Sequence, residues 1–458
     1  MRGQGDEGAT AVVLFTRDLR VHDHPALAEA VRVAERVVPL FVLDDGLLGG
    51  EFASANRLRF LLEALRDLDG SLRALGGGLV VRRGDPVREV LAIARSVGAR
   101  TVLASSDVSA YARRRARRLT AACGEAGLEF RSLPGVTVVE PGSLTPGTGD
   151  HFRVFTPYWT RWRALPFRLL APRPRRIRLP AGVARGRLPE LRDLTRGAPS
   201  PALPTGGESA ARARLDAWLR GGLSRYPERH DDVAADATSR LSPYLHFGCL
   251  SPVEVARRAA NRPGGAAFIR QLCWRDFHHQ VAAAFPAIAR VDCRPRGDRW
   301  DDDATALAAW KDGRTGYPLV DAGMRQLRAE GWMHNRARLV AASFLVKDLY
   351  LDWRLGAAHF LDLLVDGDLA NNAGNWQWVA GTGNDTRPNR VFNPVRQARR
   401  FDPGGGYIRR WVPELREVAD ARVHEPWRLE AAERRRLTYP ETIVDHAVAA
   451  AAFRGRRR

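Results

Sequence analysis

Short apolar runs alternate with amphipathic segments along the first 135 residues of the chain. A short, continuously apolar run is typical of a strand buried on both faces, whereas apolar residues at helical spacing indicate a helix with one buried side. Strands that alternate with helices predict βαβ units and a parallel sheet. The expected strands are residues 11–15, 37–43, 79–82, 101–104 and 128–132, and the expected helices are residues 25–35, 54–68, 85–97 and 109–122.

A parallel sheet of this kind binds its ligands at the carboxyl ends of the strands. The two common phosphate-binding patterns, GxGxxG and GxxxxGK followed by Ser or Thr, are both missing from this region. The glycine run at 76–78 is more simply explained as a turn. We therefore expect any ligand of the sheet to bind without a standard phosphate loop.

The rest of the chain has a different pattern. Residues 171–204 contain seven prolines and eight arginines without a clear period, which indicates a long connection over the surface. From about residue 206 the pattern is mostly helical. We expect an α/β plus all-α architecture: a Rossmann-like parallel-sheet domain over residues 1–135, a linker over 136–205 and a helical domain over 206–458.

Two serine–proline pairs in the helical region resemble helix starts. Ser242 followed by Pro243 fits an N-cap and the first helical residue, and SPVE at residues 251–254 fits a capping box with proline at the first position.

The formal net charge of +20 suggests a polyanionic partner, for which nucleic acid is the obvious candidate. Nearly all of the positive charge is arginine, because Lys311 and Lys347 are the only lysines. A chain rich in Arg, Ala and Gly also arises from a GC-rich genome, so the charge alone leaves both explanations open.

The four cysteines form no CxxC pair, which argues against a zinc finger and predicts reduced, mostly buried thiols (Cys123, Cys249, Cys273, Cys293). No apolar run approaches the ~20 residues of a membrane span, and VVLF near the amino terminus is too short for a signal peptide. We expect a cytoplasmic protein without a membrane-spanning helix.

Polar groups gather beside aromatic residues in the second half, and all 12 tryptophans lie at or beyond residue 159. TSRLS (238–242) places three hydroxyls at the start of a helix, where they bind a diphosphate or simply cap the helix through Ser242. DGDL (366–369) is either a capping pair or an acid couple for a metal or for ribose hydroxyls. No histidine or third acid lies at ligand spacing, so we expect no metal.

Two helical segments carry charges among apolar residues. QLCWRDFHHQ (271–280) is compatible with an ordinary helix whose core residues are Leu272, Phe277 and Val281 and whose other residues face solvent. In residues 331–350, arginines such as Arg338 interrupt a strongly apolar helix and need partners. Asp366 or a phosphate would serve.

Taken together, these segments resemble the photolyase/cryptochrome family, and the resemblance covers essentially the whole chain in order. The matching segments are FTRDLRVHDHPAL (15–27), FRVFTPYWTRW (152–162), TSRLSPYLHFGCLSP (238–252), QLCWRDF (271–277), TGYPLVDAGMRQLRAEGWMHNRAR (315–338), ASFLVKDLYLDWR (342–354), DGDLANNAGNWQW (366–378) and VFNPVRQARRFDPGGGYIRRWVPEL (391–415).

The resemblance implies an amino-terminal domain that carries an antenna chromophore and a helical domain that buries FAD. The antenna is approached near residues 105–115, and its type (folate, deazaflavin or flavin) stays open. The FAD-binding positions implied by the resemblance are Tyr226, Thr238, Ser239, Arg240, Leu241, Ser242, Phe268, Arg275, Arg338, Asp366, Gly367, Asp368 and Asn372.

The resemblance also assigns roles around the flavin. Asn372 matches the residue that faces flavin N5, where an uncharged amide suits the fully reduced state. An electron-hopping chain from the flavin to the surface is implied at Trp376, Trp353 and Trp300. Aromatic walls of a substrate cavity are implied at Trp274 and Trp378, and contacts to DNA or substrate at Gln271, Asn335, Arg336 and Gln397.

The sequence departs from the pattern of the family members that repair cyclobutane dimers. Gln271 replaces a glutamate that hydrogen-bonds the dimer, Leu339 replaces a methionine, and His230 stands where an arginine is common. The implied activity is light-driven splitting of pyrimidine dimers in damaged DNA by a monomer, with Asn372, Gln271 and Trp274 as the catalytic positions.

Two rival activities remain. The chemistry of a (6-4) photolyase resembles a histidine-assisted proton transfer. In this sequence the positions concerned are Asn335 and Leu339, which cannot act as acid or base. A cryptochrome-like light receptor usually has a long signalling tail, whereas this chain ends at RGRRR. Gln271 favours the receptor, and Asn372 favours repair.

Overall fold

The computed structural model describes residues 8–50 and 53–457, so the outer ends of the predicted domains (residues 1–7 and 458) lie outside it. The chain divides into two compact units whose segments interleave along the sequence. The sheet unit consists of Met1–Ala198, Pro204–Leu223 and Ser239–Pro286. The helical unit consists of Pro199–Leu203, Ser224–Thr238 and Ala287–Arg458. The domain boundaries at residues 135 and 205 stay a prediction.

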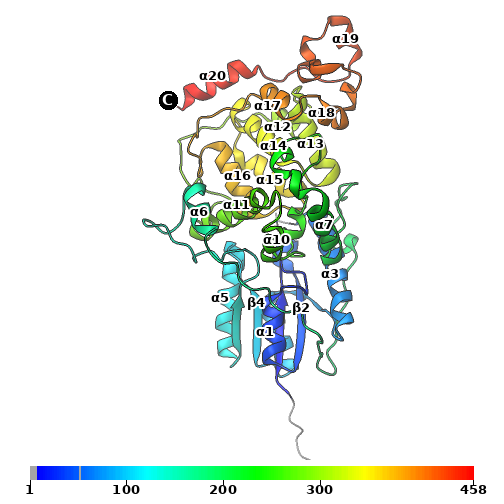
Figure 1. The fold of residues 1–458 in the computed structure, drawn as a ribbon, viewed down its shortest axis with the longest axis vertical. Helices are drawn as coiled ribbons and strands as arrows, with labels where there is room; N and C mark the ends of the chain where they lie inside the picture. Colours follow the sequence, from blue (N-terminus) through cyan, green and yellow to red (C-terminus); the bar gives the residue numbers. More distant parts are fainter. Residues whose placement is uncertain (1–7, 51–52, 458) are drawn as a thin grey trace, which may run out of the picture. The chain divides into compact units, whose positions relative to one another are not determined.

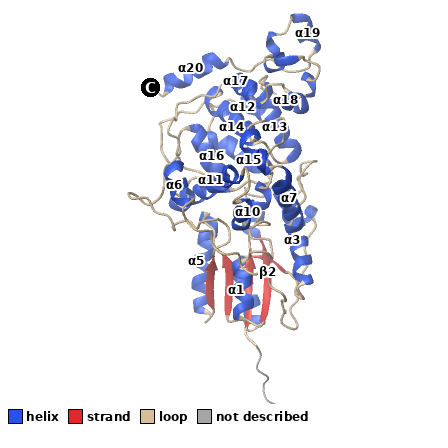
Figure 2. Ribbon diagram, in the orientation of Figure 1, coloured by secondary structure: helices blue, strands red, loops and turns tan. Residues whose placement is uncertain are grey.

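The sheet unit contains a five-stranded parallel sheet in the order β3-β2-β1-β4-β5, shown as red arrows in Figure 2. The predicted fold class is therefore confirmed, and every expected strand is present to within about two residues. The strands are β1 (Thr10–Phe15), β2 (Arg36–Asp44), β3 (Val80–Gly84), β4 (Thr101–Ser105) and β5 (Glu129–Leu133).

The helices between the strands begin where a side chain binds the first free N–H groups. His24 accepts from Leu27 N at 3.0 Å before α1, and Asp85 accepts from Val87 N at 3.0 Å before α4. A fifth helix, α2, was not predicted, since a single turn shows no period. The helices are α1 (Pro25–Val33), α2 (Asp45–Leu48), α3 (Ala55–Ala74), α4 (Pro86–Ser96) and α5 (Ala110–Glu125).

The proline- and arginine-rich connection within 171–204 has only one short 3-10 helix, η1 (Leu191–Asp193). Part of it runs along the sheet. Val81 of the edge strand β3 donates to Arg185 O at 2.7 Å, and Ile177 donates to Leu75 O at 2.7 Å. The connection thus satisfies a backbone group of an edge strand that would otherwise face solvent.

Beyond residue 206 the chain is helical, as predicted (Figure 1). The sheet unit adds α6 (Phe155–Trp162), α7 (Glu208–Gly221), α9 (Ser242–His246), α10 (Pro252–Ala259) and α11 (Gly265–Ala284). The chain passes from the sheet unit to the helical unit within the 3-10 helix η2 (Leu223–Arg225). No helix within residues 8–50 and 53–457 is long and apolar enough to span a bilayer.

The helical unit packs its helices around one hydrophobic core that includes several tryptophans. Its elements are α8 (Tyr226–Arg229), α12 (Ala304–Asp312), α13 (Pro318–Glu330), α14 (Asn335–Ser343), the π-helix η3 (Phe344–Asp348), α15 (Trp353–Leu363), α16 (Leu369–Ala380), α17 (Pro394–Phe401), α18 (Gly406–Trp411), η4 (Pro413–Leu415), η5 (Asp420–His424), η6 (Pro426–Arg428), α19 (Ala431–Arg436) and α20 (His446–Arg456).

One of the two predicted helix starts is wrong. Ser242 is the first residue of α9 and not its N-cap, which is Leu241 and makes no side-chain capping bond. The reason is the backbone of Arg240, whose φ of 51° places it in the left-handed region and turns the chain before the helix. Ser251 is the N-cap of α10, as predicted, and accepts from Glu254 N at 3.2 Å.

The thiol prediction is confirmed. All four cysteines are free, and Cys123, Cys249 and Cys273 are buried. Burial raises the pKa of Cys249 to about 12, because the charged thiolate would be cut off from water. This thiol therefore stays protonated near neutral pH.

Candidate functional site

Arg338 of α14 and Asp366, which precedes α16, form the ion pair expected from the sequence. Arg338 Nη2 donates to Asp366 Oδ2 at 2.8 Å, and Arg338 Nε donates to Met333 O at 2.8 Å. The guanidinium also lies 6.0 Å from the Trp332 ring centroid. The arginine is therefore fixed by a carbonyl and by the acid whose charge it neutralises.

The other oxygen of Asp366 has no hydrogen-bond partner although it is buried. A buried carboxylate oxygen without a donor costs free energy, so this atom needs an N–H or O–H group from a ligand. The neighbouring acid is occupied. Asp368 is the N-cap of α16 and accepts from Asn371 N at 2.9 Å and Asn371 Nδ2 at 2.7 Å. Gly367, between the two acids, is buried.

Asn372 lies in the first turn of α16 and is partly exposed. Its Nδ2 donates to Ala357 O of α15 at 3.1 Å, which fixes the orientation of the amide and leaves its oxygen available as an acceptor. Trp376 follows four residues later and therefore lies on the same side of the helix as Asn372.

Of the three tryptophans proposed for electron transfer, the last in the predicted chain is the most exposed. Trp376 and Trp353 are buried in the core of the helical unit, and Trp300 packs against this core while remaining partly exposed. Gly356 of α15 makes room for Trp376, since a Cβ there would lie 2.2 Å from Trp376 Cη2. Trp353 Nε1 donates to Asp292 Oδ1 at 2.9 Å, which orients this indole.

The residues proposed to contact DNA differ in how free they are. Arg336 forms two hydrogen bonds of 2.7 Å to the carboxylate of Asp231 and lies 4.8 Å over the Phe401 ring. Asn335 is exposed and Gln397 is partly exposed. The carboxylate of Asp231 balances the charge of this guanidinium and occupies two of its donors, so Arg336 is a weaker phosphate ligand than its sequence position suggests.

Sequence analysis missed Arg390. Its guanidinium lies 4.9 Å from the Trp378 ring and 5.0 Å from the Phe392 ring, and the residue is exposed. This arrangement places a cation beside an aromatic wall, which suits a phosphate next to a stacked base. Nothing in the local pattern marks this one arginine among so many.

In the sheet unit, α11 carries the remaining aromatic and basic positions. Arg275 donates to Val136 O at 2.6 Å and to Leu245 O at 3.4 Å. Phe268 is buried with its ring 5.7 Å from that of Trp218. Gln271 is exposed and Trp274 is partly exposed, so both are accessible at the surface of this unit.

The polar face of α11 corrects a prediction. Residues outside Leu272, Phe277 and Val281 were expected in solvent, yet Asp276, His278, His279 and Gln280 are buried. The reason is that distant segments supply partners for some of them. Asp276 accepts from Val139 N and from Trp162 Nε1, both at 2.9 Å.

The segment 238–242 combines a turn with hydroxyl groups. Ser239 Oγ accepts from Leu241 N at 3.3 Å, and Ser239 O accepts from Arg214 Nε at 2.7 Å. Ser242 is exposed, and the Thr238 hydroxyl is buried without a hydrogen-bond partner. Tyr226 of α8 is buried, and burial raises the pKa of its phenol, so it stays neutral.

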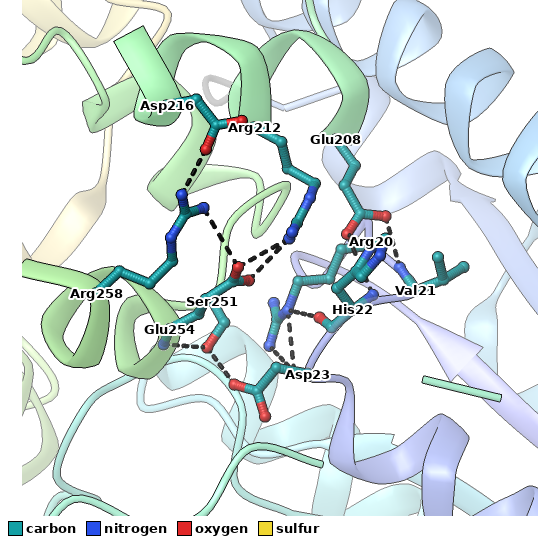
Figure 3. Close-up of polar contacts among 10 residues, drawn as sticks. All are labelled: Arg20, Val21, His22, Asp23, Glu208, Arg212, Asp216, Ser251, Glu254 and Arg258. Atoms are coloured by element: carbon teal, nitrogen blue, oxygen red, sulfur yellow. Dashed lines mark hydrogen bonds and ion pairs between the residues drawn. The ribbon is translucent and has the colours of Figure 1, made fainter. Parts of the chain in front are cut away.

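The loop that follows β1 is held by a charged network that sequence analysis also missed (Figure 3). Arg20 is buried and donates to Gly248 O at 2.9 Å and to Gly135 O at 3.0 Å. Glu208 of α7 accepts from Val21 N at 2.8 Å and from His22 N at 3.1 Å. Burial raises the pKa of Asp23, but hydrogen bonds from Arg168 and Ser251 hold this pKa below its ordinary value.

The same network continues on α10. Glu254 accepts from Arg212 Nη1 at 2.9 and 3.0 Å, and Ser251 donates to Asp23. Each of these buried charges has an opposite charge or a backbone group beside it, as buried ions require. The loop after β1 is thereby fixed to α7 and α10 within the sheet unit.

Two cavities of about 320 and 420 Å³ lie in the sheet unit near the carboxyl ends of β4 and β5. Ser106, Asp107 and Arg113 line both of them, and Phe130 and Ser132 of β5 line the smaller. Their position agrees with the expected approach to a second chromophore at residues 105–115.

Comparison with known proteins gives matches over both units. The family profile described as DNA photolyase matches residues 11–176, and that described as FAD binding domain of DNA photolyase matches residues 268–457. A deoxyribodipyrimidine photo-lyase of Streptomyces griseus is 54% identical over 97% of this chain and 98% of its own length. A cryptochrome DASH of Natronomonas pharaonis is 37% identical over 95% of this chain and 98% of its own length.

Solved structures agree. A class III photolyase from Agrobacterium tumefaciens superposes with a TM-score of 0.93 at 33% identity and covers 99% of this chain and 98% of its own. A Sulfolobus tokodaii photolyase solved with two FAD molecules, one suggested as a light-harvesting cofactor, has a TM-score of 0.85 at 29% identity, over 98% of this chain and 99% of its own.

Proposed function

Since the chain belongs to the photolyase/cryptochrome family, we propose that it uses light to split cyclobutane pyrimidine dimers in DNA. The observation that carries the proposal is the identity of 54% along nearly the full length of a relative named deoxyribodipyrimidine photo-lyase. The relative named cryptochrome DASH is less similar, at 37%.

The residues present fit FAD. The unpartnered Oδ1 of Asp366 suits an N–H of the flavin ring, and Arg338 balances the charge of this acid from the other side. The unpartnered Thr238 hydroxyl suits a phosphate oxygen, as do the hydroxyls of Ser239 and Ser242. We also propose contacts to FAD for Phe268, Arg275, Tyr226, Arg240, Leu241, Gly367, Asp368 and Asn372.

When bound in its reduced state, FAD supplies under illumination the electron that opens the cyclobutane ring, and it takes that electron back. Asn372 presents an amide whose orientation Ala357 O fixes, and this amide would face flavin N5 without adding a charge. Trp376, Trp353 and Trp300 would pass electrons between the surface and a bound FAD, because indole rings are oxidisable.

DNA recognition rests on phosphates and on an extruded dinucleotide, because the damaged bases must leave the duplex stack to reach a buried cofactor. Trp274 and Trp378 stack on the bases, at about 1–3 kcal/mol per base. Gln271 hydrogen-bonds the dimer, and Arg390 binds a flanking phosphate. Asn335, Arg336 and Gln397 line the approach, and affinity decreases as salt concentration rises.

We place a second, light-harvesting chromophore in the cavities near the ends of β4 and β5. Its chemical type is open among folate, deazaflavin and flavin. The four free cysteines, three of which are buried, are compatible with a reducing cytoplasm, where we expect the protein to act as a monomer.

The decisive experiment illuminates the purified, flavin-loaded protein with blue light in the presence of an oligonucleotide that carries one thymine dimer. We expect light-dependent restoration of the two thymines, and no restoration in the dark. Bound FAD without loss of the dimer would refute the repair proposal and favour a light receptor. Loss of a (6-4) product instead of the cyclobutane dimer would identify the other repair activity.

A further inference from the structure

Phe155, the first residue of α6, lies face to face with Trp274 of α11. The two ring centroids are 3.6 Å apart and the ring planes differ by 4°. Another stacked pair of the sheet unit, Phe60 and Phe247, is looser, with centroids 4.8 Å apart and planes 27° apart. One face of the Trp274 indole is therefore covered by an aromatic ring from a distant part of the sequence.

Helix α6 and the residue Phe152 before it are each bound to α11, and the two helices lie side by side (Figure 1). Gln280 of α11 accepts from Phe152 N at 3.0 Å and donates to Phe152 O at 2.8 Å. Trp162 Nε1 donates to Asp276 Oδ2 at 2.9 Å. These bonds lie on either side of Phe155 in the sequence, so the phenyl ring is held in place independently of Trp274.

The two rings differ in exposure. Phe155 is buried, whereas Trp274 is partly exposed. The guanidinium of Arg270, one turn before Trp274 on α11, lies 5.3 Å from the Phe155 centroid and adds a cation to the pair. Phe155 thus supports the indole from the inside of the unit. The rings of Phe277 and His278 also lie near Trp274, at 5.6 and 5.9 Å, and the indole remains partly exposed.

We infer that Phe155 is a positioning residue for the pocket that binds the pyrimidine dimer. By stacking on Trp274 it holds the indole immobile, so that the indole is presented to an extruded base. This inference rests on the proposed function. Ordering a side chain on binding weakens an interaction, and a side chain that is already ordered avoids this loss. Phe155 therefore affects the affinity for damaged DNA through Trp274 and does not touch the DNA itself.

The test compares three variants of the flavin-loaded protein. Phe155→Leu removes the aromatic ring but retains a buried apolar side chain, and Phe155→Tyr retains the ring. Phe60→Leu is the matched control, because it removes a phenylalanine from the other stacked pair of the sheet unit. The first measurement is the Kd in the dark for a duplex with one thymine dimer and for the same duplex without damage.

We expect Phe155→Leu to weaken binding of damaged DNA by about 2- to 10-fold, the range that ordering one side chain implies, with little change for undamaged DNA. Phe155→Tyr should bind as the unchanged protein does, and so should Phe60→Leu. Equal affinity of Phe155→Leu and the unchanged protein would overturn the inference. Equal loss of affinity for both duplexes, or loss in Phe60→Leu as well, would also overturn it, because it would indicate general destabilisation.

A second measurement needs no DNA. Hydroxyl-radical footprinting reports the oxidation rate of Trp274 in the free protein, which we expect to increase in Phe155→Leu and to stay unchanged in Phe155→Tyr. An unchanged rate in Phe155→Leu would show that the ring does not cover Trp274. If the unchanged protein failed to prefer damaged DNA, the proposed function would be refuted, and the footprint would still report whether the stacked pair exists.

Discussion

Asp276 is a buried carboxylate of α11 whose ionisation the fold opposes. Replacing it by asparagine tests the hydrogen bonds that join α11 to Trp162 of α6. Its Oδ2 accepts from Val138 N, Val139 N and Trp162 Nε1 at 2.9–3.0 Å. Its Oδ1 is less occupied, with Val138 N at 3.3 Å and Arg275 Nη1 at 3.9 Å. A proton can therefore sit on Oδ1 while Oδ2 keeps its three donors.

Burial raises the pKa of Asp276 to about 7, although the charge of Arg275 and the three N–H donors oppose this. The folded protein thus holds a proton that the unfolded chain loses near pH 4. The contribution of Asp276 to stability is fully present below about pH 4 and is lost as the pH rises to about 7. About three pKa units correspond to about 4 kcal/mol, which is an upper limit on the total change.

The asparagine of the Asp276→Asn variant would imitate the protonated acid, because its carbonyl can take the place of Oδ2 and its amide cannot ionise. Between about pH 5 and pH 8 we therefore expect the difference in unfolding free energy between Asp276→Asn and the unchanged protein to shift in favour of the variant. Urea unfolding followed by circular dichroism at each pH measures this difference. A difference that stays constant over this range would refute the reasoning, since Asp276 would then be ionised throughout.

Further predictions concern the cofactor and the substrate. Trp376→Phe should abolish light-driven reduction of the oxidised flavin, measured by its absorbance, while Trp310→Phe, which alters a buried neighbour 6.1 Å away, should not; normal photoreduction in the first variant would remove the hopping assignment. Arg338→Met should leave the buried charge of Asp366 unpaired, at a cost of about 3 kcal/mol, and lower both the melting temperature and the flavin content. An Arg338→Met variant with an unchanged melting temperature and flavin content would contradict the assigned pair of Arg338 and Asp366. Gln271→Glu should raise the repair yield per absorbed photon, and an unchanged yield would make this departure from the family pattern neutral.

Local sequence patterns were sufficient wherever one segment decides its own structure. The central strands of the sheet unit could be predicted because they are continuous apolar runs, and β1 is buried along its whole length, whereas the edge strand β5 has no buried residue. Ser251 could be identified as a cap because its partner, Glu254 N, is three residues away. The prediction of Ser242 as an N-cap was wrong because the backbone of Arg240 adopts a left-handed conformation, which the residue types of this segment do not indicate.

The candidate site could be approached from the sequence only where its residues are near one another or match a family segment. Asp366, Asn372 and Trp376 share one short stretch. Asp366 was expected, with a phosphate as the alternative, as the partner of Arg338, because an arginine on an apolar helix needs one. Whether these residues bind flavin stays a prediction. Their hydrogen bonds, in particular the unpartnered oxygen of Asp366, came from the tertiary structure.

The sequence by itself determined the parallel sheet, the helical character of the second half and the starts of the four helices predicted between the strands, because these depend on apolar periodicity and on bonds within one turn. Only the tertiary structure decided which buried polar groups meet. Glu208 binds the amide of Val21 across 187 residues, and Asp276 binds Trp162 across 114. A buried charge requires a partner, but the sequence does not specify which residue that partner is. Only the folded structure identifies it.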